Sequence, residues 1–409
     1  MTASELRRPR STSAAFPVAW AVVALACLAF LSAGPRGTLG DRDGGSPAAG
    51  HLEPLGGHRP AQEPGVDTVG DVPEPGRFFA EYVRKGRPLL MKGAARNMAA
   101  FQLWTDDYLR MHYGDLEVVV EEGKKESRSN RLWSMSIRQF LEEYQREDMY
   151  MVASVPPSMA GQVGLLRCLL CGGFTQRLQD AVMWFSSGGT NSVLHFDAVD
   201  NINCIMDGTK EIFLVDKEEE ENISIDHPDG NFSGVDVDRV DLNKYPGLSR
   251  VPWYNVTMQP GDCVFIPYRW FHQVRSPAGR SLAFNIWFVH LLRFNTSDCQ
   301  PGLELPEYQA LSRFQLVSDT EQLRGEIAIF VDSLAEGVLE AGDLLLLADS
   351  FDISSEESAT LFELLDQNKD QRVTLNEVTS CNIAEVVERV PGLGRTDSDG
   401  PQQEVHEEL

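Results

Sequence analysis

The chain has 409 residues, and its 36 Lys and Arg against 61 Asp and Glu give a formal net charge of −25 at pH 7. An acidic balance of this size excludes a broad nucleic-acid-binding surface, because such surfaces set a basic stripe against phosphate. The length suggests two or three structural units of roughly 100–200 residues each, and seven cysteines are too few for a disulfide-built scaffold.

The first 33 residues have the pattern of a targeting segment. Residues 1–13 contain Arg7, Arg8 and Arg10, and the uncharged run at 14–33 is long enough to cross a membrane as a helix. Because the arginines precede the run, we expect a single-pass type II membrane protein whose N-terminus is cytoplasmic. A cleaved signal peptide is the alternative, and it also sends the rest of the chain into the lumen.

Two further features indicate the endoplasmic reticulum. The acidic tail at 396–409 ends in His-Glu-Glu-Leu, a close variant of the KDEL signal that a retrieval receptor reads. N-x-S/T sequons, whose asparagine is a glycosylation acceptor, lie at Asn222, Asn231, Asn255 and Asn295. We therefore expect a lumenal protein that binds a KDEL-type retrieval receptor.

Composition divides the rest of the chain. Residues 34–76 hold 11 of the 34 glycines and 7 of the 22 prolines, which predicts a flexible linker without a core of its own. A folded domain is expected at 77–298, where short apolar runs cut by Gly, Pro, Asn and Asp predict a β-sandwich or barrel from about 182 to 289. A helical region is expected at 299–395.

One spacing in the β-rich segment indicates a metal site. His195 and Asp197 are two residues apart, so on a strand both side chains point to the same face. His272 follows a Pro-Gly-Asp turn and an apolar strand, just after Pro267. Two His and one carboxylate on one face of an octahedral ion leave three positions open, which suits Fe(II) that must also take a chelating co-substrate and O₂.

With these elements in place, the chain resembles the JmjC-type, cupin-fold Fe(II)/2-oxoglutarate oxygenases, particularly the hydroxylase-like branch, over roughly residues 75–292. The resemblance implies an α+β fold with a double-stranded β-helix (cupin, or jelly-roll) core and flanking helices. It also implies a co-substrate pocket next to the iron. The implied ligands of Fe(II) are His195, Asp197 and His272, and the implied contacts of 2-oxoglutarate are Lys210, Asn201, Asn285 and Ser192.

The reaction implied by the resemblance is oxidative decarboxylation of 2-oxoglutarate to succinate and CO₂, coupled to attack on a C–H bond. Hydroxylation and N-demethylation share this chemistry and differ in the carbon attacked. Because histones are absent from the lumen, we expect a hydroxylase of protein side chains in the secretory pathway. The alternative is a calcium-binding interaction protein built on an inactive scaffold.

A second metal site is expected near the C-terminus. Residues 366–377 fit the 12-residue loop of an EF-hand, which binds Ca²⁺ through fixed positions. The predicted ligands are Asp366, Asn368, Asp370, the carbonyl of Arg372, and Glu377. Gln371 replaces the glycine that normally makes the sharp turn, and no second loop is evident. The alternative is a solvated acidic turn between helices.

The cysteines allow several pairings. Cys168 and Cys171 form a CxxC motif whose Leu-Leu filler favours a packed structural pair or a local disulfide over a thioredoxin-type redox site. Cys299 and Cys381 have a spacing that allows a bridge from the barrel to the C-terminal helices.

Overall fold

The structure is a computed structural model, and it describes residues 48–125, 131–226, 232–300, 302 and 304–394. The predicted segments 1–13 and 14–33, the acceptor Asn231, and the tail 396–409 with its retrieval signal lie outside the described residues.

The core of the fold is a large sheet in which only the first pair of strands is parallel. In spatial order its nine strands are β1 (Asp67–Val69), β2 (Leu89–Met91), β12 (Cys263–Ile266), β9 (Asp200–Asp207), β14 (Ser281–Phe288), β7 (Leu178–Ser186), β5 (Met149–Ser154), β3 (Glu117–Glu122) and β4 (Leu132–Ser136).

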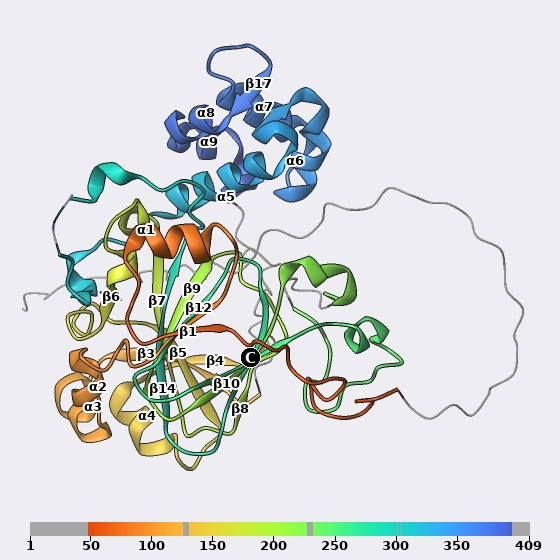
Figure 1. The fold of residues 1–409 in the computed structure, drawn as a ribbon. Helices are drawn as coiled ribbons and strands as arrows, with labels where there is room; N and C mark the ends of the chain where they lie inside the picture. Colours follow the sequence, from red (N-terminus) through yellow and green to blue (C-terminus); the bar gives the residue numbers. More distant parts are fainter. Residues whose placement is uncertain (1–47, 126–130, 227–231, 301, 303, 395–409) are drawn as a thin grey trace, which may run out of the picture.

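A smaller antiparallel sheet faces the large one and completes a barrel (Figure 1). Its order is β11 (Tyr254–Met258), β10 (Lys210–Val215), β13 (Phe271–Ser276) and β8 (Thr190–Asn191). Apolar side chains from both sheets meet inside, among them Ile205 and Ala283 from the large sheet with Ile212 and Leu214 from the small one. This arrangement is consistent with the expected double-stranded β-helix and the α+β class.

The outer face of the large sheet is covered by short helices that form the main core with it. These helices are α1 (Pro75–Phe78), α2 (Ala99–Leu103), α3 (Asp106–Tyr113) and α4 (Ile137–Glu143). Thr105 caps the N-terminus of α3, since its side chain accepts a hydrogen bond from the Tyr108 N–H. Every second residue of β7, including Met183 and Phe185, enters this outer core, so the residues between them face the barrel interior.

The expectation of a flexible linker at 34–76 is wrong for the part that the structure describes. Residues 48–62 lie along the segment that connects β10 to β11 (Figure 1), with Leu52 N–H donating to Val240 O at 2.8 Å and Gln62 N–H to Trp253 O at 2.7 Å. Trp253 also donates its indole N–H to Arg59 O. Backbone pairing and one large aromatic side chain therefore order a segment that is poor in large apolar residues of its own.

The C-terminal region is a helical layer against one end of the barrel (Figure 1). It consists of α5 (Asp319–Ser333), α6 (Leu344–Ser350), α7 (Ser355–Leu365), α8 (Leu375–Ser380) and α9 (Ile383–Arg389), which share a separate apolar core. Its first helix contacts the barrel closely, because a Cβ added to Gly325 would lie 2.4 Å from the Val289 side chain. Two short strands, β16 (Val338–Glu340) and β17 (Arg372–Thr374), pair within this layer.

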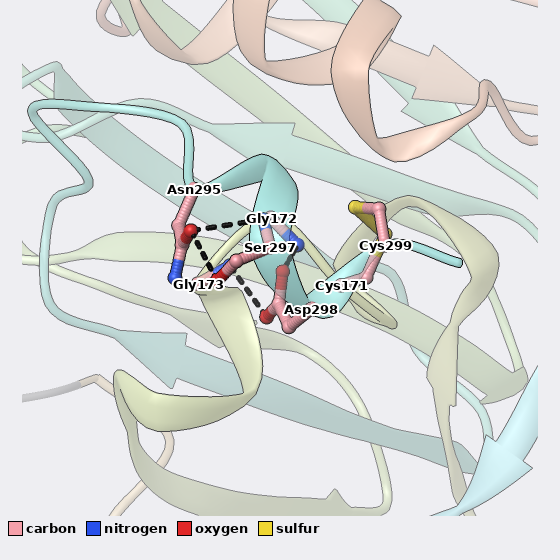
Figure 2. Close-up of a disulfide and its surroundings, with 7 residues drawn as sticks. All are labelled: Cys171, Gly172, Gly173, Asn295, Ser297, Asp298 and Cys299. Carbon is pink, nitrogen blue, oxygen red and sulfur yellow. Dashed lines mark hydrogen bonds between the residues drawn. A yellow bond between two sulfur atoms is a disulfide. The ribbon is translucent and has the colours of Figure 1, made fainter. Parts of the chain in front are cut away.

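Disulfides tie distant segments of the barrel domain together. Cys171 is bonded to Cys299, and Cys204 on β9 is bonded to Cys263 on the neighbouring β12. Figure 2 shows that the residue before Cys299 also contributes, because the Asp298 carboxylate accepts from the N–H groups of Gly172 and Gly173. The local disulfide between Cys168 and Cys171 and the bridge from Cys299 to Cys381, both left open by the sequence, are therefore not formed, and Cys168 and Cys381 are buried free thiols.

Two strands complete the list of paired elements: β6 (Gly164–Leu166) and β15 (Tyr308–Ala310) form a small antiparallel ladder beside Cys168. No described helix combines the length and apolar character needed to cross a bilayer. This finding contradicts the expectation of a single-pass type II membrane protein.

Candidate functional site

Two imidazoles come together across neighbouring chain segments at one end of the barrel. The segment after β8 was expected to be a strand, but it is an extended stretch without regular pairing that runs antiparallel to β13. Ser192 N–H donates to Val274 O at 2.9 Å, and His195 and His272 exchange backbone hydrogen bonds of 3.1 and 2.7 Å. Directly paired residues place their side chains side by side, and the two imidazole centroids are 4.2 Å apart.

The carboxylate of Asp197 completes this group. One of its oxygens lies 3.9 Å from His195 Nε2 and the other lies 3.6 Å from His272 Nε2. One ligand atom from each residue lies within 4.8 Å of the other two, and the side chains are almost fully buried. The Asp197 carbonyl accepts from the Arg269 N–H at 2.9 Å, which fastens this segment to the turn before β13.

The hydrogen bonds of the two imidazoles suit metal binding. His195 Nδ1 lies 2.9 Å from Val193 O, and His272 Nδ1 lies 3.0 Å from Trp270 O. A carbonyl oxygen only accepts, so each Nδ1 carries the proton and each Nε2 keeps its lone pair for a metal. The expected triad is thus assembled, and its donor set fits a divalent transition metal such as Fe(II).

Lys210 lies at the opposite end of the same interior. It starts β10 with its side chain on the face of Ile212 and Leu214, is 3% exposed, and donates to Ser276 Oγ at 3.1 Å. Among the described residues no carboxylate pairs with it. Burial alone lowers the pKa of the ammonium from 10.5 to about 8. A cation held in an apolar barrel without an acidic partner fits a ligand that brings its own carboxylate.

Between Lys210 and the triad lies a row of buried amides. Asn201 and Asn203 are on β9 and Asn285 is on the adjacent β14, all less than 9% exposed. The Asn203 amide N–H donates to Asn285 Oδ1, while Asn201 Oδ1 has no hydrogen-bond partner among the described residues. The expected pocket residues Asn201 and Asn285 therefore line the same interior as Lys210.

The hydroxyl of Ser192 makes its hydrogen bonds to backbone groups. It donates to Val193 O at 3.1 Å and accepts from the Val274 N–H at 2.8 Å. Both contacts fasten the extended segment before His195 to β13, so in the structure Ser192 supports the ligand segment. Its contact with 2-oxoglutarate stays a prediction.

Several residues of the interior were missed in the sequence. Ser276, Asn203 and Trp184 all face the pocket, and none stands in a motif. The available signal was the two-residue alternation of strands, which places Asn203 on the face of Asn201. Alternation does not show which strands close against one another, so it identifies a face without identifying a pocket.

The predicted calcium loop runs from the end of α7 through β17 into the first turn of α8. Asp366 and Glu377 are each 8% exposed, while Asn368, Asp370 and Arg372 are exposed. The Asp366 carboxylate accepts from the backbone N–H groups of Asp370 and Gln371, and Glu377 accepts from the Thr374 N–H and hydroxyl, both at 2.9 Å. Ser354 and Glu357 form a capping box at the start of α7, a pattern that the sequence itself contains.

The sequence showed no partner for this loop, but the structure has one. The pairing of β16 with β17 sets the unit α5–β16–α6 against the unit α7–β17–α8. The connection from α5 to β16 has Ala335 and Gly337 in place of a ligand series. Ligand spacing therefore did not identify the unit α5–β16–α6, although this unit shares an apolar core with the unit α7–β17–α8.

The three described sequons differ in exposure. Asn255 is exposed on β11, which is an edge strand of the small sheet. Asn295 is exposed as well, and its Oδ1 accepts from the Ser297 N–H and hydroxyl (Figure 2). Asn222 is half-buried between Glu219 and Arg250. Glycosylation of these asparagines stays a prediction.

Comparison with known proteins finds one matching family and several similar proteins for the region that forms the barrel. A family described as "cupin-like domain" matches residues 75–293. Jumonji C domain-containing protein 5 of Drosophila melanogaster is 25% identical over 53% of this chain and 58% of its own length, and lysine-specific demethylase 8 of Danio rerio is 27% identical over 52% and 55%. The bifunctional peptidase and (3S)-lysyl hydroxylase JMJD7 of Homo sapiens is 22% identical over 54% and 84%. The chain thus spans little more than half the length of the first two.

Proposed function

Because the chain belongs to the cupin-like domain family, with JmjC-type relatives, we propose that it is an Fe(II)- and 2-oxoglutarate-dependent dioxygenase that hydroxylates side chains of secretory-pathway proteins. The observation that carries this proposal is that a buried His195–Asp197–His272 group shares one barrel with a buried Lys210 that pairs with no carboxylate of the described residues. A scaffold without activity has no need of either feature.

Each residue has a role in this proposal that its surroundings support. The two Nε2 atoms and the Asp197 carboxylate would hold Fe(II), which supplies the activation of O₂ when bound. Lys210 would bind the distal carboxylate of 2-oxoglutarate with charge and with a hydrogen bond. The amides of Asn201 and Asn285 would orient the co-substrate between these ends, and the apolar interior that includes Ile205 and Ile212 would exclude water.

A protein substrate in an oxidising compartment is supported by the cysteines. Disulfides persist in secreted and lumenal proteins and are rare in the reducing cytosol. Two of them, Cys171–Cys299 and Cys204–Cys263, are formed here, and exposed sequons at Asn255 and Asn295 agree with the same compartment. In such a compartment a hydroxylase is favoured over a histone demethylase. The partners we propose are a secretory-pathway protein and a retrieval receptor for the terminal tetrapeptide.

The proposal is tested with purified protein, Fe(II), ascorbate and 2-oxoglutarate. We expect succinate formation that rises with lumenal client proteins and disappears in His195→Ala, with the modified side chain located by mass spectrometry of clients trapped on the variant. His290→Ala is a matched control outside the triad. Absence of iron-dependent turnover with every lumenal client would contradict the proposal.

The second candidate is a calcium-binding interaction protein on an inactive scaffold, and the two functions differ in metal content. An active oxygenase purified without oxygen retains iron in proportion to protein, whereas a scaffold need not. The buried positions of Asp366 and Glu377 and the β16–β17 pairing favour calcium binding by the loop in either case. Calcium would raise the unfolding temperature of the full chain, and Glu377→Gln should remove this rise. An unchanged melting curve up to several millimolar Ca²⁺ would count against it.

A further inference from the structure

One buried polar group of the barrel interior has no role in the proposed function. The indole nitrogen of Trp184, on β7, is inaccessible to solvent and has no hydrogen-bond partner among the described residues. An indole N–H only donates, and leaving a buried donor unpaired destabilises a fold. A ligand that offers an acceptor at this place would satisfy it.

The register of the strands fixes the direction of this side chain. Met183 and Phe185 on either side of Trp184 belong to the outer core, so Trp184 faces the barrel interior. Its direct neighbours across the sheet are Ala283 on β14 and Val152 on β5. Ala283 is part of the interior apolar cluster and has a smaller side chain than Val152 and Ile205 in the same row.

The same register places Trp184 along the axis of the pocket. On its other side, Ala283 pairs with Ile205 on β9. Two residues after Ile205, β9 ends at Asp207, and the turn that follows leads to Lys210 at the start of β10. One step in the other direction, Val182 pairs with Asn285 in the amide row. Trp184 therefore lies between the level of Lys210 and the level of the amides.

Aromatic neighbours restrict the indole. Its ring centroid lies 5.7 Å from that of Tyr150 and 6.5 Å from that of Trp287, both in tilted or edge-on arrangements. Packing on two sides limits rotation of a two-torsion side chain. The N–H is therefore held in one direction before a ligand arrives.

We propose that Trp184 is a specificity-determining residue of the co-substrate pocket, whose indole N–H donates to the same distal carboxylate that Lys210 binds. This inference rests on the proposed 2-oxoglutarate dependence and adds a second donor to it. Two donors at fixed places on one carboxylate select a five-carbon 2-oxo diacid over a 2-oxo acid that ends in a methyl group.

The test is direct binding to the Fe(II)-loaded full chain under anaerobic conditions, measured by calorimetry so that no turnover is required. 2-Oxoglutarate is compared with 2-oxovalerate, which has the same length and lacks the distal carboxylate. In Trp184→Phe we expect affinity for 2-oxoglutarate to fall about tenfold, as for one lost charge-assisted hydrogen bond. The affinity of Trp184→Phe for 2-oxovalerate should stay within about twofold of the wild-type value. The ratio of the affinities for 2-oxoglutarate and 2-oxovalerate therefore becomes smaller in the variant.

Trp133→Phe is the matched control, because Trp133 lies on the edge strand β4, outside the barrel interior, and should leave both affinities unchanged. Unchanged discrimination in Trp184→Phe would overturn the inference. Failure of the wild-type chain to bind 2-oxoglutarate would instead overturn the proposed function. If Trp184→Phe does not fold, a crystal structure of the wild-type complex decides: a carboxylate oxygen within about 3.2 Å of Nε1 supports the inference, and any other placement overturns it.

Discussion

Two places were expected to bind metal: the mouth of the barrel, which is the end with His195, Asp197 and His272, and the 366–377 loop. They hold their metal-ligating side chains in different ways. At the mouth, His195 and His272 are fixed by backbone pairing between two chain segments, and their Nδ1 atoms are occupied by carbonyls. In the loop, the carboxylates of Asp366 and Glu377 are occupied by backbone N–H groups of the same loop. At the mouth the two Nε2 atoms face the Asp197 carboxylate, whereas the loop must exchange internal hydrogen bonds for an ion.

The two sites therefore differ in how far their ligand residues must rearrange when a metal binds. Strand pairing holds the imidazoles in place whether or not a metal is bound, so binding there requires little rearrangement. The loop also contains Lys369 and Gln371 at positive φ, where a residue other than glycine is strained. We therefore expect iron to be held more tightly at the mouth than calcium in the loop.

The largest expected effect comes from removing one carboxylate at each site. Asp197→Ala should lower iron affinity by roughly a hundredfold or more, because even loss of a group that only orients a ligand costs 10–100-fold. Asp366→Ala should leave iron content unchanged and affect calcium only. Metal analysis of the two purified variants checks this, and loss of iron in Asp366→Ala would show that the sites are coupled.

A smaller effect is expected from pH at Lys210. Burial lowers the pKa of this lysine to about 8 from 10.5, so below pH 8 the folded protein carries the full penalty of a buried ammonium. Between about pH 8 and 10.5 the unfolded chain binds more protons than the folded one, and the stability of the ligand-free protein should rise with pH. Affinity for 2-oxoglutarate should fall over the same range, because it needs the ammonium.

Thermal unfolding and calorimetry at pH 7 and pH 9.5 measure both trends. Lys210→Met is the control: it should bind 2-oxoglutarate weakly at either pH and should show no contribution of this site to the pH dependence of stability. A wild-type affinity that does not change between these pH values would contradict the assignment of Lys210 to the carboxylate.

The smallest expected effect is at Gln371 in the loop. Its φ of +66° is one that glycine adopts without strain, so Gln371→Gly should stabilise the loop by about 1 kcal/mol. Because the ion-free loop already holds this φ, calcium affinity should rise by no more than the factor of about five that corresponds to this free energy. Isothermal calcium titration of the full chain measures this, with Gln367→Gly, just after Asp366, as the comparison; weaker binding by Gln371→Gly would contradict the strain argument.

Much of the site could be predicted from the sequence, because it depends on short segments and on the spacing of residues within them. The interval from His195 to Asp197, the turn before His272, and the capping box Ser354–Glu357 depend on a few neighbouring residues. The role of Ser192 was not accessible, because its hydroxyl contacts Val274 from a distant strand. The order at 48–62 was missed for the same reason, since its partners are Val240 and Trp253.

By itself the sequence indicated the class of fold, the three residues of the proposed iron site and the pattern of the proposed calcium loop, because strand alternation, turn residues and ligand spacing are properties of short segments. Only the tertiary structure decided which side chains share the interior with Lys210, that Cys171 pairs with Cys299, and that the indole N–H of Trp184 is buried without a hydrogen-bond partner among the described residues. These facts depend on the register between strands far apart in the chain. Register is fixed by packing of the whole barrel, so no local pattern contains it.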